Sequence, residues 1–289
     1  MPLDLIHKRP QEFVAALEFT SAETGFSAPL IEKDYWCSLV LDALFAAPSP
    51  LVFKGGTLLS KAYANFDRLS EDLDFTIPTP LDTNRTERSR RAHDVGALLE
   101  NIRQTLGMAW AENWKGHNSS TQHTGKLTYP SVLGGTGTIL VEAGQREVLE
   151  RPAVAIELKT LLLNPLFSEP VLPPIKVIGL SKVEAYAEKV RAALTRKEPA
   201  IRDIYDLWQA VEQKVISVNN HDWIALAKRK CSAYELDDSC SVERKAVFQS
   251  GVKTDLHPVL RSGLAESFDF DFAWKILLAI HGRLTNKQP

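Results

Sequence analysis

The sequence predicts an α/β (α+β) protein in which a lobe with a mixed sheet and flanking helices is followed by a helical lobe. Two observations lead to this fold class. In the first part of the chain, short apolar segments typical of strands alternate with longer segments of helical spacing. After the proline-rich segment "NPLFSEPVLPPI" (164–175), helical spacing dominates. We therefore expect an α/β lobe over residues 1–168 and, beyond a proline-rich linker, a helical lobe over 169–289 that completes a cleft.

The first half of the α/β lobe is expected to begin with two helices and then to alternate strands with helices. Prolines in "AAPSP" end the second helix, and a Gly-Gly pair marks the turn after the first strand. In order, the expected elements are helices at 11–22 and 28–47, a strand at 51–53, a helix from near Thr57, a strand that contains Asp72 and Asp74, and a helix at 83–106.

The second half of this lobe is expected to complete the sheet. Residues 113–137 are rich in Gly, Ser, Thr and Asn, which indicates loops around a hairpin that includes "KLTY". The segments "TILVEAG" (138–144) and "AVAIELK" (153–159) are two further strand candidates.

The helical lobe is expected to begin with a capped helix. Ser181 and Glu184 have the spacing of a capping box, in which each side chain accepts from the other residue's backbone N–H. An apolar stripe follows at helical spacing. Its members are Val183, Ala187, Val190 and Leu194. The segment "EPAIRDIYDLWQAVEQ" (198–213) predicts the next helix.

Composition excludes several classes of protein. The chain has 289 residues, of which 44% are hydrophobic and 24% charged, as in ordinary globular proteins, and its net charge of −2 provides no overall attraction to nucleic acid or membrane. Its three cysteines form no C-x-x-C pair, which argues against a disulfide framework and a zinc site. No signal peptide or membrane span is visible. We therefore expect a soluble, cytoplasmic protein with no membrane partner.

The segment "RLSEDLDFTI" (68–77) places two acids on one face of a predicted strand. Successive side chains of a strand point to opposite faces. Leu73, Phe75 and Ile77 therefore share one face, and Ser70, Asp72, Asp74 and Thr76 share the other. Two carboxylates about 7 Å apart on one face repel each other. A bound cation would remove this cost, so the pattern suggests a metal site.

A glycine turn stands upstream of the two acids. In "LVFKGGTLLSKAY", glycines permit a sharp turn and let a ligand approach backbone N–H groups, and the helix that follows offers free donors suited to phosphate. Paired aspartates prefer a hard ion such as Mg²⁺. Together these features suggest metal-assisted phosphoryl or nucleotidyl transfer. A P-loop is excluded, because Ser60 and Ala62 stand where that motif requires Gly and Ser or Thr.

Several motifs in the same order resemble a known family. "IEKDYW" (31–36), "KGGTLLSKAY…RLSEDLDF" and, further on, "AEKVRAALTR…RDIYDLW" are similar to the AbiEii/MenT nucleotidyltransferase toxins of bacterial toxin–antitoxin and phage-defence systems. That family belongs to the DNA polymerase β-like nucleotidyltransferase superfamily. The resemblance covers roughly residues 28–212 and implies a nucleotidyltransferase-like α/β lobe beside the helical lobe.

The resemblance also implies roles for individual residues. The expected nucleotide-binding residues are Lys54, Gly55, Gly56, Thr57, Ser70, Lys189 and Asp203. The expected catalytic residues are Asp72, Asp74, Lys189 and Asp206. Asp72 and Asp74 would also be metal ligands, and Lys189 would neutralise charge on the triphosphate.

The superfamily takes a third metal carboxylate from a neighbouring strand, and two residues compete for this role. They are Glu142 in "ILVEAG" and Glu157 in "AIELK". We favour Glu142, because the family places this acid before an Arg-Glu pair and "EAGQRE" has that arrangement.

The resemblance implies a metal-dependent transfer of a nucleoside monophosphate from an NTP, with release of pyrophosphate. Two Mg²⁺ ions, with Mn²⁺ as a substitute, would be held about 3.5–4 Å apart. The implied acceptor is RNA, with the 3′ end of tRNA as the expected target, and the implied partner is a separate antitoxin protein. Two alternatives stay open, namely an NTP-binding defence switch without turnover and transfer to a small molecule or protein. The sequence does not specify which NTP is used.

Overall fold

The computed structural model describes residues 5–80 and 82–285, which fall into two compact units. The first unit, here called the sheet lobe, runs to Leu149 and resumes over Ala153–Leu180. The second unit, the helical lobe, combines Glu150–Pro152 with the chain from Ser181 onward. The change from one unit to the next therefore lies at Ser181 and not at 169, and the chain also enters the helical lobe briefly at 150–152.

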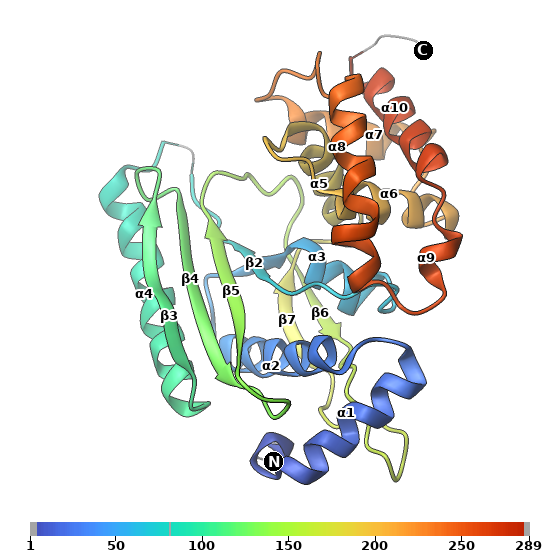
Figure 1. Ribbon diagram of the computed structural model, residues 1–289. Helices are drawn as coiled ribbons and strands as arrows, with labels where there is room; N and C mark the ends of the chain where they lie inside the picture. The colour runs from blue at the N-terminus through green and yellow to red at the C-terminus, as the bar shows by residue number, and fades with distance from the viewer. Residues whose placement is uncertain (1–4, 81, 286–289) are drawn as a thin grey trace. The chain divides into compact units, whose positions relative to one another are not determined.

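The sheet lobe is built on a seven-stranded mixed sheet, formed by the described residues in the order β3-β4-β5-β2-β1-β7-β6 (Figure 1). Its strands are β1 (Val52–Lys54), β2 (Leu73–Thr76), β3 (Ala109–His117), β4 (Gln122–Pro130), β5 (Thr136–Gly144), β6 (Val154–Leu158) and β7 (Ile175–Gly179). The pairs β2–β5 and β1–β7 are parallel and the other pairs antiparallel. The predicted α/β class is confirmed.

Helices α2 and α4 cover the apolar face of this sheet. Phe75 of β2 is fully buried and its ring lies 6.2 Å from that of Phe45 on α2. Further along the sheet, the indole of Trp114 on β3 donates to the Ala92 carbonyl of α4. The helical elements of this lobe are η1 (Ile6–Lys8), α1 (Pro10–Thr24), α2 (Ala28–Phe45), α3 (Gly55–Leu58), the π-helical turn η2 (Leu59–Tyr63) and α4 (Arg85–Thr105).

Two expectations for the sheet lobe are wrong. Most of residues 113–137 belongs to strands β3, β4 and β5 and not to loops, although the predicted hairpin that includes "KLTY" is present, with β4 antiparallel to both neighbours. The proline-rich segment 164–175 connects β6 to β7 of the same sheet, so it is not the linker between lobes. It is held to its own lobe by backbone bonds, including one of 2.8 Å from the Val171 N–H to the Leu162 carbonyl.

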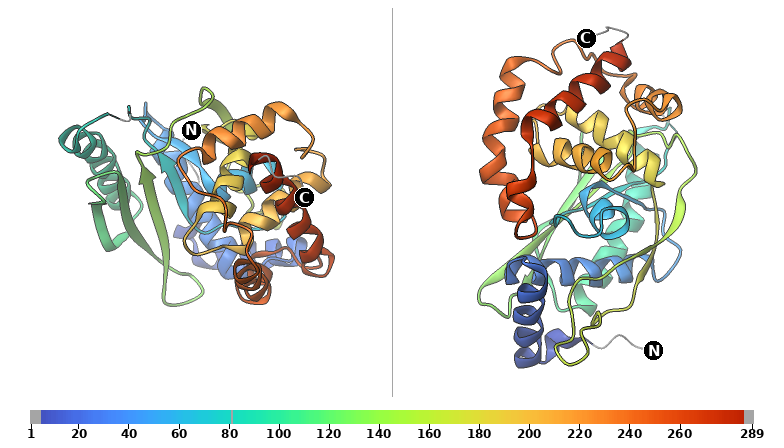
Figure 2. Two further views of the ribbon diagram at one scale, coloured as in Figure 1. Left: turned by 90° about the horizontal axis from the view of Figure 1, so that it is seen from above. Right: turned by 90° about the vertical axis from the view of Figure 1, so that its right-hand side faces the viewer.

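The helical lobe consists of helices joined by turns and loops, and Figure 2 shows it from two further sides. Its elements are α5 (Lys182–Thr195), α6 (Ile201–Glu212), α7 (His221–Cys231), α8 (Val242–Gly251), η3 (Val252–Leu256), η4 (His257–Val259), α9 (Leu264–Ser267) and α10 (Phe270–Thr285). Helix α5 packs against α6 and α7, and α10 packs against α6. None of the helices in the described part of the chain has the length and apolar character needed to cross a membrane.

The capping box predicted at the start of α5 does not form. The Ser181 hydroxyl accepts no bond from the helix. Glu184 is fully buried and accepts 2.9 Å bonds from the backbone N–H groups of Glu150 and Arg151. It also pairs with Lys230 at 2.6 Å. Glu184 therefore holds the returning chain segment on the helical lobe, a tertiary role that competes successfully with local capping.

Candidate active site

The glycine turn and the acidic strand of the sheet lobe are in direct contact. Gly55 has a left-handed backbone with φ +82°, and a Cβ there would lie 2.2 Å from Asp74 Oδ2. A Cβ on Gly56 would lie 2.7 Å from Ser70 Oγ and 2.8 Å from an Arg68 guanidinium nitrogen. Only glycine allows this approach. The turn therefore lies against the Asp74 carboxylate and the Ser70 hydroxyl.

Strand register aligns three charged residues on one face of the sheet. Lys54 of β1 is the register partner of Asp74 on β2, and Asp74 is the register partner of Glu142 on β5. Register partners point to the same face with their Cβ atoms about 4.5–5.5 Å apart. We call Lys54, Asp74 and Glu142 the acidic row. It lies on the face opposite the buried Phe75, so its side chains are not part of the core.

The same register separates the two candidates for the third acid. Glu142 is beside Asp74, whereas Glu157 is on β6 at the far edge of the sheet and pairs in register with Lys176. Glu157 is also exposed. Of the two, Glu142 is the one with a position suited to sharing a ligand with Asp74.

Asp72 lies immediately before β2 and is fixed through its backbone. The buried Thr57 donates from its hydroxyl to the Asp72 carbonyl at 2.6 Å. Because this hydroxyl is used to hold the acidic segment, a phosphate contact from Thr57 would come from its backbone N–H. The first N–H groups of a helix have no acceptor within the helix, and α3 begins at Gly55 and not near Thr57 as expected.

The "IEKDYW" segment of α2 anchors both sides of the site. Asp34 pairs with the fully buried Lys61 of η2 at 2.7 Å, and Ser38 accepts a 2.9 Å bond from the same ammonium. Lys33 pairs with Glu71, the residue before Asp72, at 3.3 Å. Since η2 follows the glycine turn directly, α2 holds the turn through one ion pair and the acidic segment through the other.

Two acids of this site have the chemistry that a divalent ion prefers. Within the described residues, no three Asp, Glu, His or Cys side chains gather into a preformed cage. The neighbouring pair Asp74 and Glu142 instead offers carboxylate oxygens on one partly exposed face. Mg²⁺ is usually bound by one or two carboxylates together with substrate phosphates and water. A metal bound here would take these two carboxylates as ligands and complete its coordination with water or substrate oxygens.

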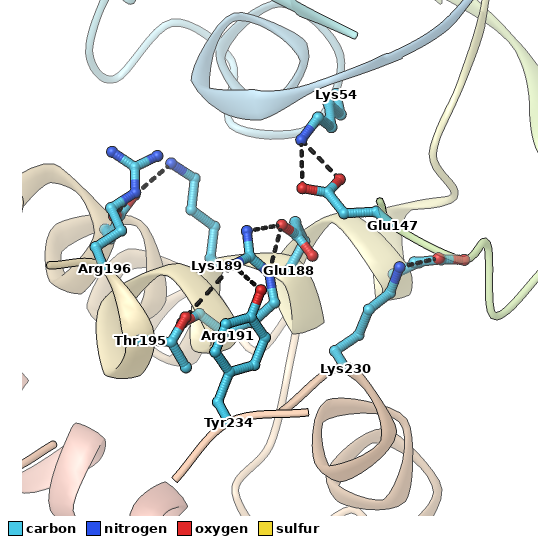
Figure 3. A network of polar contacts seen from close by, with 11 residues as sticks. Lys54, Glu147, Glu188, Lys189, Arg191, Thr195, Arg196, Lys230 and Tyr234 are labelled. Atoms are coloured by element: carbon cyan, nitrogen blue, oxygen red, sulfur yellow. Dashed lines mark hydrogen bonds and ion pairs between the residues drawn. The ribbon is translucent and has the colours of Figure 1, made fainter. Parts of the chain in front are cut away.

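Lys54 is held by a carboxylate that the sequence analysis did not single out. Its ammonium contacts both carboxylate oxygens of Glu147, at 2.8 and 2.7 Å (Figure 3). Both side chains are partly exposed, with exposed fractions of 15% and 22%. Lys54 was predicted to bind nucleotide, and its position in the acidic row is compatible with that role.

In the helical lobe, Lys189 of α5 meets both aspartates predicted on α6. Its ammonium lies 2.8 Å from Asp203 Oδ1 and 2.9 Å from Asp206 Oδ2. The exposed fractions of the three side chains are 9%, 2% and 6%. We call these three residues the buried triad. Arg196, which is half-exposed, adds a second cation 3.3 Å from Asp203.

A family model described as "Nucleotidyl transferase AbiEii toxin, Type IV TA system" matches residues 40–274, which is most of the chain. The chain belongs to the AbiEii family. It is accordingly a nucleotidyltransferase toxin of a type IV toxin–antitoxin system, and that type of system implies an antitoxin partner. The matched range contains the acidic row and the buried triad, whereas "IEKDYW" precedes it. No curated protein matches the chain.

Two residues near the AbiEii motif were missed by sequence reasoning. Arg68 is buried, and its guanidinium lies against Gly56. Its position at the start of "RLSEDLDF" was the available signal. Glu147 is in the Arg-Glu pair of "EAGQRE", which served only to choose between Glu142 and Glu157. Its contact with Lys54 joins residues 93 positions apart, and no local pattern indicates such a contact.

Proposed function

We propose that this AbiEii protein transfers a nucleoside monophosphate from an NTP to an RNA acceptor, the 3′ end of tRNA, and releases pyrophosphate. The reaction would depend on Mg²⁺, with Mn²⁺ as a substitute, and would take place in the cytoplasm. It would arrest growth as part of phage defence, and a separately encoded antitoxin would oppose it. The observation that carries the proposal is the approach of Gly55 to the Asp74 carboxylate, with Glu142 in register beside it.

The nucleotide would be oriented by the glycine turn and the basic groups beside it. The backbone N–H groups of Gly55, Gly56 and Thr57 are suited to phosphate oxygens because they begin a helix. Lys54 directly precedes this turn and the Ser70 hydroxyl lies against Gly56, so both side chains would add donors. Glycine at both positions lets the phosphates approach the backbone closely.

The carboxylates would define where the reacting groups meet. Asp72, Asp74 and Glu142 would hold Mg²⁺, which when bound neutralises phosphate charge and favours ionisation of the acceptor hydroxyl. Fixing the triphosphate relative to the carboxylates would align the α-phosphate for in-line attack and remove much of the entropic cost. The attacking hydroxyl would release its proton to solvent water, its oxygen would form the new P–O bond at the α-phosphate, and the bond to pyrophosphate would break, so that pyrophosphate leaves.

The buried triad would supply a positive charge for the triphosphate, a role that the AbiEii family implies for its lysine. Lys189 would neutralise charge on the triphosphate, and Asp203 and Asp206 would orient its ammonium, as their 2.8 and 2.9 Å contacts indicate. In this role the two aspartates act through Lys189.

The test is incubation of the purified protein with each labelled NTP, Mg²⁺ and total RNA. Label recovered in tRNA, together with pyrophosphate, supports the proposal. Label in a protein or small molecule contradicts the RNA acceptor and supports the broader transferase alternative. Bound NTP without pyrophosphate release contradicts catalysis and supports a nucleotide-binding switch. Full activity in EDTA would contradict the metal requirement.

A further inference from the structure

Glu147 forms a contact that the proposed transfer reaction does not by itself require. It lies beyond the end of β5 and binds the Lys54 ammonium through both carboxylate oxygens. Such a two-oxygen contact between partly buried charges orients the lysine side chain. The charge of Lys54 is therefore directed along the sheet toward Glu147.

The alternative partner for Lys54 is Asp74. Register places the two residues directly opposite each other on neighbouring strands, a separation that a lysine side chain spans easily. Opposite charges in such cross-strand positions normally pair. Yet the ammonium is bound to Glu147, and Asp74 has no ion pair within the described residues.

A lysine bound to Asp74 would compete with a divalent cation for the same carboxylate. The metal would then have to displace the ammonium before it could bind, and its affinity would fall by the free energy of the pair. In the acidic row, the Lys54 ammonium could therefore compete with a metal ion for Asp74. Glu147 prevents this competition by binding the ammonium itself.

We infer that Glu147 is a positioning residue that holds Lys54 away from Asp74 and thereby keeps the Asp74 carboxylate available for a divalent metal ion. This inference rests on the proposed function for the presence of the metal. It adds a residue that touches neither metal nor acceptor and acts through Lys54. It also explains why a lysine is tolerated beside a metal-binding acid.

The experiment measures Mn²⁺ binding to the protein in the absence of nucleotide, by the loss of the free-ion signal in electron paramagnetic resonance. Glu147→Ala should raise the Kd for Mn²⁺ by about fivefold, the effect of one partly exposed ion pair formed at the metal site. The double variant Glu147→Ala with Lys54→Met should return the Kd to within about twofold of wild type, because no ammonium remains to compete.

The matched control is Glu112→Ala, which removes the carboxylate of the 2.9 Å Lys126–Glu112 pair in the same lobe but away from the acidic row. Its Kd should equal that of wild type. Thermal unfolding of each variant checks that the fold is retained.

The outcomes separate this inference from the proposed function. If wild type binds Mn²⁺ and Glu147→Ala binds it equally well, Lys54 does not compete and the inference is wrong. If the double variant binds as weakly as Glu147→Ala, Glu147 acts directly on the metal and the positioning role is wrong. If wild type itself binds no Mn²⁺, the proposed metal site is wrong, and this inference is overturned with it.

Discussion

The acidic row and the buried triad use the same residue types in opposite ways. In the buried triad, one lysine lies between two aspartates and the three side chains are at most 9% exposed. In the acidic row, the lysine is bound to Glu147, outside the row, and Asp74 and Glu142 stand side by side on a partly exposed face. The lysine of the triad contacts both acids of its own cluster, whereas the lysine of the row contacts an acid outside it.

This difference indicates which cluster is suited to binding a cation. Two adjacent carboxylates that face solvent repel each other, and a bound cation removes that repulsion. A buried lysine with two carboxylates already has its counter-charges, and removing it would leave buried charge without compensation. Substitutions in the row should therefore affect chemistry more than stability, and substitutions in the triad should affect stability strongly.

The largest effect is expected from Asp74→Asn. Loss of this carboxylate should lower nucleotidyl transfer by about 10³-fold, because charge stabilisation at a reacting phosphate contributes several kcal/mol. Stability should change by less than about 1 kcal/mol, since the core face of β2, with Leu73 and Phe75, is unaltered. Single-turnover transfer of labelled NTP and urea unfolding measure the two quantities.

The matched controls for this substitution are the two competing third acids. Glu142→Gln should lose activity with Asp74→Asn, whereas Glu157→Gln, at the exposed edge of the sheet, should keep it. Activity that survives in both Asp74→Asn and Glu142→Gln would show that the acidic row is not the reaction centre.

The second effect concerns stability. Lys189→Met should lower the free energy of unfolding of the helical lobe by about 3–5 kcal/mol, because two buried carboxylates lose their shared counter-charge. Lys54→Met should lower that of the sheet lobe by no more than about 1 kcal/mol, since Glu147 is partly hydrated. Urea unfolding followed by circular dichroism compares them. If both variants lose the same free energy of unfolding, the buried triad and the acidic row do not differ in how much their lysine stabilises the fold.

Sequence reasoning succeeded where chemistry is local and failed where the contact is distant. Gly-Gly, Asp72 and Asp74 lie within one short segment. Strand alternation and one turn were therefore enough to predict that the glycines and the acidic strand lie close together. The partners of Lys54 and Glu184 come from remote segments, and the capping box at Ser181 was displaced for that reason. A periodic pattern cannot specify such partners.

Strand β4 shows a different cause of failure. Its buried positions alternate regularly, but only two of the four carry a large apolar side chain. The four buried positions are His123, Gly125, Leu127 and Tyr129, of which Leu127 and Tyr129 are the large apolar ones. Gly125 is required because a Cβ would lie 2.8 Å from the Trp110 ring. In a sequence, glycine usually indicates a loop. In β4, Gly125 instead leaves room for the Trp110 side chain.

The third effect tests the contact on which the acidic row depends. Gly55→Ala combines backbone strain at φ +82° with a clash against Asp74, and should destabilise the sheet lobe by about 2–3 kcal/mol. It should also abolish transfer, because the Asp74 carboxylate must move. Gly107→Ala is the matched control, with φ +67° but no atom within 4 Å of the new Cβ. It should cost about 1 kcal/mol and leave transfer intact. Equal effects at both glycines would mean that strain alone matters.

The smallest effect is a pH dependence that both lobes should share. Burial raises the pKa of the Cys37 thiol on α2 and of the Cys231 thiol on α7 from 9.0 to about 12. Above pH 9 the unfolded chain loses these protons and the folded protein keeps them, so each thiol lowers stability as pH rises toward 12. At pH 10 the loss should be roughly 1 kcal/mol per thiol.

Urea unfolding of wild type, Cys37→Ala and Cys231→Ala at pH 8 and 10 measures this loss of stability, because each alanine variant should lack the contribution of its thiol. A similar share from both thiols would show that the lobes exclude water equally well, so that the contrast between the row and the triad reflects their charge partners. A share from Cys231 alone would instead indicate that the sheet lobe admits water around α2, and the open character of the acidic row would then extend into its core.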